Sequence, residues 1–182
     1  MEKTRGVADV PDQLTLTRHR DLVGRRSAGI WVPRAILAVI AAFCIAALAN
    51  VFGQRPESVY ADTPVVKVSV YAPSAMRGGD FMEARFHITA KQDIKKAILK
   101  LDPGWVEGMS MNTIEPAPIG QGSDDGRLVF TLGHIAAGHS FILFTQFQVN
   151  PTNVAWNRPQ NVEIDDGNTV LAVVHHSMTV FP

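Results

Sequence analysis

The sequence has one cysteine among its 182 residues, Cys44, and this residue lies inside an apolar run. A disulfide within the C-terminal part of the chain is therefore excluded, so that part must be held together by its apolar core. Asn-x-Ser/Thr glycosylation signals are also absent after residue 52. These absences fit a bacterial envelope protein better than a eukaryotic ectodomain.

The motifs of the common enzyme classes are absent as well. The nearest match to a G-x-S-x-G nucleophile motif, which begins at Gly108 and has its serine at Ser110, lacks the final glycine. Neither a phosphate-binding loop nor a G-x-G-x-x-G dinucleotide fingerprint follows any expected strand. We therefore expect no enzymatic activity and no cofactor.

Charge is scarce and unevenly distributed. The formal net charge is zero, yet residues 1–34 carry seven Lys/Arg against four Asp/Glu, whereas residues 56–182 carry nine against thirteen. A mildly acidic C-terminal part argues against nucleic acid as a partner, because phosphate binding needs a basic surface. The basic N-terminal segment is suited to anionic lipid headgroups of a bilayer.

The longest apolar run, residues 35–52, contains no charged residue and one amide, Asn50. Its length reaches the roughly 18 residues at which an apolar run indicates a transmembrane helix. Pro33 stands just before it, as is common at a helix start. Because basic residues accumulate upstream, the positive-inside rule predicts a cytoplasmic tail over 1–34 and an extracytoplasmic location for the rest. The predicted localisation is a bacterial cell membrane, with a single pass.

A cleaved signal peptide is the alternative interpretation, since Ala47-Leu48-Ala49 matches an A-x-A cleavage site. The 34 residues before the apolar run are too many for an ordinary signal-peptide leader, which favours a retained anchor. Within the run, Ala38, Ala42 and Ala46 recur every four residues and would form a small-residue face for packing against another transmembrane helix. The predicted partner is an integral membrane protein or a second copy of the chain.

After Pro64 the apolar period changes to two, which is typical of half-buried β-strands. Residues 53–64 contain two prolines and are expected to be a linker. Residues 141–149 begin apolar on both faces, as expected of a central strand. Residues 102–126 and 150–161 are expected to be irregular. The expected strands cover 66–70, 82–89, 94–101, 127–132, 141–149 and 169–181.

Such strands, separated by turn dipeptides, predict a Greek-key β-sandwich. The segment 128–144 also resembles the strand, Leu-Gly-x-apolar-x-x-Gly corner, strand element of bacterial extracytoplasmic Ig-like modules, with Leu132, Gly133 and Gly138 at the corner. The resemblance implies an all-β, Ig-like sandwich of about seven strands over residues 65–182, without the immunoglobulin disulfide. It implies binding or spacing, and no particular activity.

Two kinds of metal site are weighed against simpler interpretations. His176 and Met178 form an H-x-M pair on one strand face, a soft donor set that suits Cu(I), whereas methionine beside a β core is more often a filler. Met109 and Met111, two thioether donors, form a second pair in the irregular segment. Asp124-Asp125-Gly126 and Asp165-Asp166-Gly167 lack calcium-loop spacing and are better explained as turns.

Trp105 and Trp156 both lie in segments expected to be loops. Tryptophan is favoured at interface hot spots, so they are candidates for a partner interface, although a tryptophan can also plug the end of a core. The sequence therefore predicts a non-enzymatic, single-pass accessory subunit whose sandwich binds or braces a membrane-protein partner. The alternative is an envelope ligand- or copper-binding domain that uses His176 and Met178.

Overall fold

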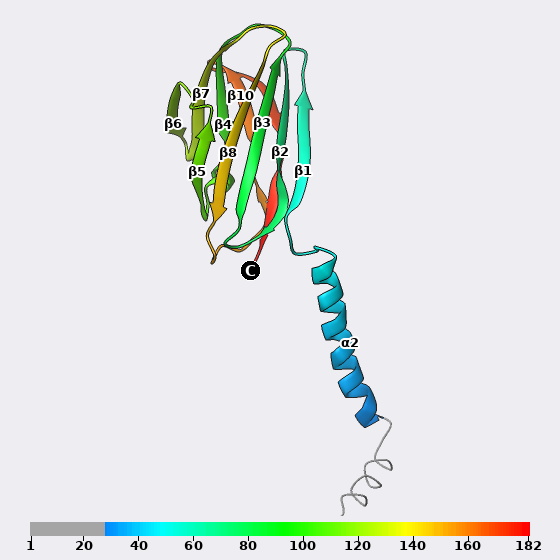
Figure 1. Ribbon diagram of the computed structural model, residues 1–182. Coiled ribbons are helices and arrows are strands. Elements are labelled where there is room, and N and C mark those ends of the chain that lie inside the picture. The colour runs from blue at the N-terminus through cyan, green and yellow to red at the C-terminus, as the bar shows by residue number, and fades with distance from the viewer. Residues whose placement is uncertain (1–27) are drawn as a thin grey trace, which may run out of the picture. The chain divides into compact units, whose positions relative to one another are not determined.

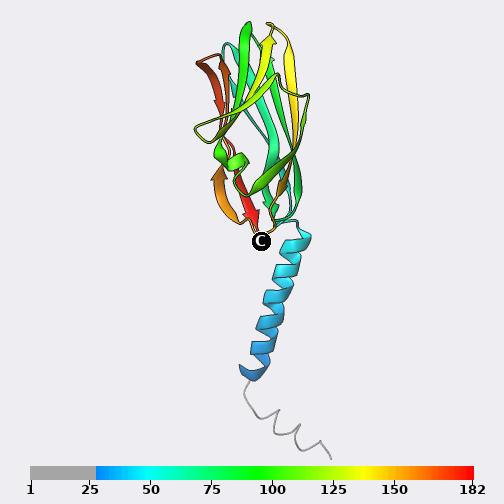
Figure 2. The same cartoon turned by 90° about the vertical axis from the view of Figure 1, so that its left-hand side faces the viewer.

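The computed structural model describes residues 28–182, which fall into two compact units, an apolar helix and a β domain that begins at Asn50 (Figures 1 and 2). The prediction of a cytoplasmic tail over 1–34 lies mostly outside the described residues. Each unit is described by itself below.

The helix α2 runs over Ala28–Leu48. Its window Trp31–Leu48 is long and apolar enough to cross a membrane. The helix starts before the predicted residue 35 because Pro33 removes one intrahelical hydrogen bond without ending it. It ends before the predicted residue 52, since Asn50 adopts a left-handed φ of 55°, a conformation that commonly follows a helix end.

The β domain is a sandwich of two sheets, which Figure 2 shows as two layers. All neighbouring strands are antiparallel except β2 and β12, which are parallel. The first sheet contains, in spatial order, β5 (Met109–Glu115), β8 (Ser140–Val149), β3 (Phe81–Ala90), β2 (Val66–Arg77), β12 (Ser177–Phe181) and β9 (Ala155–Pro159), with β1 (Arg55–Asp62) also paired to β2. The second sheet contains β11 (Thr169–Val174), β10 (Val162–Asp166), β4 (Ile94–Leu101), β7 (Arg127–Ile135) and β6 (Gly120–Asp124).

The prediction of an all-β sandwich preceded by one helix is confirmed. The predicted number of about seven strands is too low, because the described residues form twelve. One of the missed strands is β1, which occupies most of the predicted linker 53–64. Its Pro56 is compatible with a strand because β1 pairs with β2 alone and Pro lacks the N–H that a second neighbour would need.

The segments expected to be irregular also contain strands. β5 and β6 lie within 102–126, together with the short helix η1 (Pro103–Trp105), and β9 lies within 150–161. β10 follows β9 directly. The long strand predicted over 169–181 is divided into β11 and β12, because the chain leaves the second sheet and enters the first at His175 and His176.

The core lies between the two sheets and is built from the alternate residues that each strand turns inward. On β3, for example, Ala84, Phe86 and Ile88 are fully buried, whereas their neighbours Arg85 and His87 are exposed. Each large apolar side chain buried in this way contributes about 1.5–3 kcal/mol. The largest fully buried side chains are Trp105, Phe86, Phe130, Phe147, Met76, Ile88, Ile94, Leu99, Leu101, Leu143, Ile164 and Met178.

Candidate functional site

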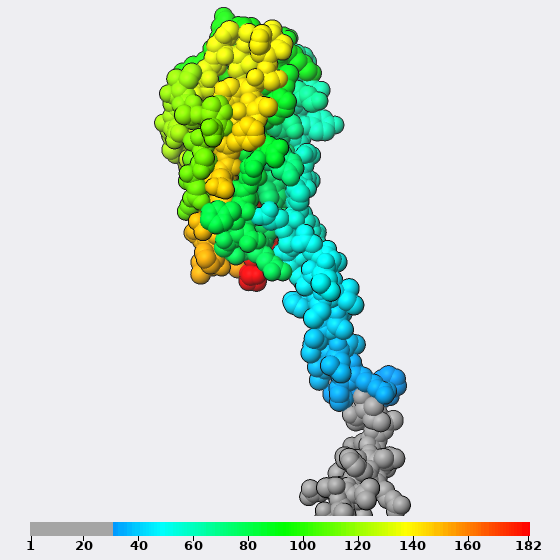
Figure 3. Space-filling model, in the orientation of Figure 1, coloured from blue at the N-terminus to red at the C-terminus, as the bar shows by residue number. Residues whose placement is uncertain are grey.

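The outer face of the first sheet carries a row of aromatic and charged side chains. The strand register places Tyr71 of β2 opposite Arg85 of β3, Arg85 opposite Phe144 of β8, and Phe144 opposite Glu115 of β5. These four residues come from four neighbouring strands and point away from the core. We call them the cross-strand row. This face is turned toward the viewer in Figures 1 and 3.

Arg85 lies between the rings of Tyr71 and Phe144. Its guanidinium carbon lies 5.0 Å from the centroid of the Tyr71 ring and 5.9 Å from that of Phe144, which is cation-π distance. Its Nε donates to Glu83 Oε1 at 2.5 Å. Both side chains of this ion pair are about half exposed, so the pair adds at most about 1 kcal/mol to stability. The arrangement fixes the orientation of an arginine between two rings.

Two hollows flank Phe144 on this face. The first has a volume of about 250 Å³, and the second has a volume of about 230 Å³. Phe144 lines both and so forms a ridge between them. The first hollow is lined by Ser69, Tyr71, Arg85, His87, Ile142 and Phe144, and the second by Glu83, Thr113, Glu115, Phe144, Thr145 and Gln146.

Apolar side chains on this face remain exposed. Ile142 and Phe144 on β8 are each 41% exposed, and Tyr60 on the adjoining β1 is 70% exposed. An apolar ridge with aromatic and arginine neighbours and a hollow on either side has features that are common at protein-binding surfaces. The sequence signal is the start of the run 141–149, which is apolar on both faces and predicts a central strand. β8 does lie between β5 and β3, but within residues 28–182 only its inner face is covered.

A third hollow, of about 320 Å³, is lined by His176, one of the two predicted metal ligands, and by its neighbour His175. His175 is exposed and His176 is buried, as expected for adjacent residues on opposite faces. Within the part of the chain that the structure describes, no three His, Cys, Asp or Glu side chains are arranged to hold a metal ion. The hollow is lined by Glu57, Val59, Asn157, Pro159, Asn161, His175, His176 and Ser177.

His176 and Met178 both point into the core. Met178 is fully buried and His176 is 5% exposed, with its ring stacked on Trp105 at a centroid distance of 5.8 Å. Neither ring nitrogen of His176 has a hydrogen-bond partner of normal geometry among residues 28–182. Burial lowers the pKa of His176 below its ordinary value of 6.5, opposed by the nearby carboxylate of Glu57. The ring is therefore neutral at pH 7.

This lowered pKa predicts that the domain loses stability in mild acid. Below pH 6.5 the unfolded chain binds a proton at His176 that the folded chain does not, so the free energy of unfolding falls as pH falls. The loss is at most about 1.4 kcal/mol per pH unit from this group. Urea unfolding of residues 50–182 between pH 7.5 and 5 measures it. His176→Phe should flatten the profile, whereas His175→Gln, at the exposed neighbour, should leave it unchanged.

The two tryptophans predicted at a partner interface occupy different environments. Trp105 is fully buried, and its Nε1 donates to the carbonyl oxygen of Gln160 at 3.0 Å. It therefore plugs the core, which was the alternative interpretation, and no partner can reach it. Gly104 allows this position because an added Cβ would lie 2.0 Å from the Pro159 carbonyl oxygen. Trp156, by contrast, is 82% exposed.

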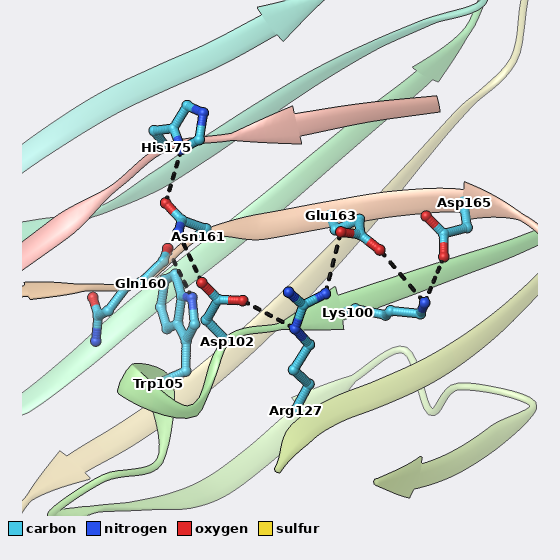
Figure 4. Close-up of polar contacts among 9 residues, drawn as sticks. All are labelled: Lys100, Asp102, Trp105, Arg127, Gln160, Asn161, Glu163, Asp165 and His175. Atoms are coloured by element: carbon cyan, nitrogen blue, oxygen red, sulfur yellow. Dashed lines mark hydrogen bonds and ion pairs between the residues drawn. The ribbon is translucent and has the colours of Figure 1, made fainter. Parts of the chain in front are cut away.

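The third hollow is connected to the second sheet by a chain of polar contacts (Figure 4). His175 bonds to Asn161, and the Asn161 amide donates to Asp102 at 2.8 Å. Arg127 then bridges Asp102 at 3.3 Å and Glu163 at 3.2 Å. These contacts tie the end of β11 to β4, β7 and β10 and so help to hold these strands together.

The same chain of contacts ends at a buried ion pair. Lys100 Nζ lies 3.4 Å from Glu163 and 2.8 Å from Asp165, whose side chain is only 1% exposed. The hydrogen bond to Asp165 raises the pKa of Lys100, so the ammonium stays charged. Asp165 and Asp166 are followed by a turn at Gly167, and Asp125 and Gly126 form the turn between β6 and β7. Turns thus lie at both aspartate pairs, as expected, although Asp124, Asp165 and Asp166 themselves end the strands β6 and β10.

The small-residue face predicted for the transmembrane segment lies on α2. Ala38 and Ala42 are exposed and Ala46 is half-buried, and all three fall within the window that is apolar enough to span a membrane. Their packing against another helix stays a prediction.

Comparison with known proteins finds no match to any family model and no similar curated protein. Among solved structures, the chain is similar to the sporulation control protein Spo0M from Bacillus subtilis, at 16% identity and a TM-score of 0.34. The match covers 66% of this chain and 51% of that structure, so this chain spans about half its length. The two sheets described above show a β-sandwich, and the function is argued from the site.

Proposed function

We propose that the chain is a non-enzymatic, single-pass subunit of the bacterial cell membrane, whose sandwich binds a membrane-protein partner through the cross-strand row. The observation that carries this proposal is the exposed ridge of Phe144 beside an arginine clamped between two rings. Aromatic and arginine side chains supply most hot spots of protein interfaces. The apolar α2 supplies the anchor that keeps the sandwich beside its partner.

The charges on this face indicate the chemistry of the partner surface. Arg85 is matched by Glu83, while Glu115 forms no ion pair among residues 28–182. The face therefore offers one unpaired carboxylate next to an apolar ridge. A partner surface that presents an apolar patch flanked by Lys or Arg complements it. A second copy of the chain would instead bring two Glu115 side chains to one interface, which favours a different protein as the partner.

Replacing Phe144 with serine should abolish recovery of the partner without unfolding the domain. Truncating an interface hot spot costs about 2 kcal/mol or more, which corresponds to roughly a thirtyfold loss of affinity. The measurement is affinity purification of the tagged full-length chain from native membranes in mild detergent, followed by quantitative mass spectrometry. Arg85→Ala should have a similar but smaller effect.

Val170→Ser is the matched control, because Val170 is an exposed apolar residue, 53% exposed, on β11 of the other sheet. It should leave partner recovery unchanged. If Phe144→Ser recovers the same companions in the same amounts as the wild-type chain, the proposed face is wrong. If the wild-type chain is recovered alone and monomeric, the accessory role itself is wrong.

A further inference from the structure

Three aromatic rings form a row at one end of the sandwich. Phe52, ahead of β1, meets Phe181 of β12 edge to face at a centroid distance of 5.6 Å. Trp156 of β9 meets the same Phe181 edge to face at 6.5 Å. We call these three residues the aromatic row. It is separate from the cross-strand row, which lies on β2, β3, β5 and β8.

The backbone of β9 is distorted where it presents Trp156. The pairing of β9 with β12 skips a residue between Met178 and Val180, and Asn157 adopts a left-handed φ of 50°. Bulges of this kind re-aim side chains and recur beside binding sites. The result here is an indole that is 82% exposed, next to Val154, which is 61% exposed. Such exposure leaves a large apolar area in water unless something covers it.

Two arginines are fixed beside the aromatic row. Arg77 Nε donates to the carbonyl oxygen of Phe52 at 3.2 Å, and Arg55 donates to that of Val51 at 2.7 Å. Neither forms an ion pair with a carboxylate anywhere in residues 28–182. Their remaining guanidinium donors are therefore available to an anionic partner, and phosphate oxygens match arginine geometry well.

The position of Phe52 in the chain indicates which partner this is. Phe52 is the fourth residue after Leu48, where the candidate membrane span ends. The residues that directly follow a span meet the lipid headgroup region, where tryptophan and other aromatic side chains are enriched and arginine contacts phosphate. Indole, phenyl and guanidinium groups held together are thus the chemistry of a bilayer interface.

We propose that the aromatic row binds the headgroup region of the phospholipid bilayer, with Trp156 at the boundary between headgroups and acyl chains and Arg55 and Arg77 on lipid phosphates. This inference rests on the proposed anchoring by α2. It assigns Trp156 a lipid surface instead of a protein partner, and it leaves the cross-strand row to the partner.

Fluorescence quenching by lipids tests the proposal on the full-length chain in phospholipid nanodiscs. Lipids brominated just below the headgroup quench tryptophans that reach that depth. Trp31→Phe leaves Trp105 and Trp156 as emitters, and Trp31→Phe/Trp156→Phe leaves the buried Trp105 alone. The difference in emission intensity between these two variants is therefore the emission of Trp156. We expect brominated lipid to remove most of that difference and aqueous iodide to have little effect on it, and we expect Arg77→Gln to weaken the quenching by lipid.

The single variant Trp156→Phe separates this inference from the anchoring on which it rests. Its quenchable emission comes from Trp31, within the candidate span. Quenching of Trp31 by brominated lipid together with iodide quenching of Trp156 would overturn the inference and leave the anchor intact. Absence of lipid quenching at both positions would overturn both. Quenching of Trp156 by lipid that is equally strong in Arg77→Gln would overturn the role of that arginine.

Discussion

Replacing Trp105 with alanine is expected to lower the free energy of unfolding of the sandwich by about 3–5 kcal/mol. The indole is fully buried and packs against Phe86 at a centroid distance of 5.3 Å, Phe147 at 5.6 Å and His176 at 5.8 Å. Alanine removes these contacts and leaves a cavity that the surrounding strands can only partly close. It also leaves the carbonyl oxygen of Gln160 without its donor.

Trp156→Ala is the matched control for this prediction. The same substitution at a side chain that is 82% exposed removes only an edge-to-face contact with Phe181, which is worth about 1 kcal/mol. Urea unfolding of residues 50–182, which form a compact unit, measures both variants. Equal losses for the two tryptophans would contradict the placement of Trp105 in the core.

The sequence patterns that predicted strands correctly share a physical basis. β2, β3, β4 and β7 each bury one face, so apolar residues alternate with polar ones along much of each strand. The strands that were missed either lack this alternation or keep it over only a few positions, as in residues 162–165 of β10. β6, for example, is Gly-Gln-Gly-Ser-Asp and has no apolar residue at all, so only its hydrogen bonds to β7 reveal it.

The candidate site was harder to predict for a related reason. The apolar residues of β8 indicate burial on both faces, but sequence alone does not say whether another element of the same chain or a partner covers the outer face. Likewise, Trp105 and Trp156 stand in similar polar surroundings in the sequence. Their environments differ because η1 turns one indole into the core while the distorted β9 turns the other outward. What covers the outer face of β8 and which way each indole points both depend on tertiary packing.

The ion pair between Lys100 and Asp165 leads to the second prediction of a large loss of stability. Lys100→Met should lower the free energy of unfolding by about 3–5 kcal/mol, because it leaves the carboxylate of Asp165 buried without a cation. Lys100 is the cation within ion-pair distance of that carboxylate, and Asp165 Oδ1 already lacks a hydrogen-bond partner among the described residues. Methionine keeps most of the length of the lysine side chain, so packing changes little and the loss reports the charge.

Lys91→Met is the matched control, because Lys91 pairs with Asp62 on the surface with both side chains more than 40% exposed. Its cost should be far smaller than that of Lys100→Met, because water screens an exposed ion pair. The double variant Lys100→Met/Asp165→Leu should recover most of the stability lost in Lys100→Met, since replacing both partners of a buried pair with apolar groups removes the uncompensated charge. Comparing the wild-type chain, Lys100→Met, Asp165→Leu and the double variant in a double-mutant cycle isolates the pair from its surroundings. If Lys100→Met is no more costly than Lys91→Met, then Asp165 is not a buried anion held by Lys100.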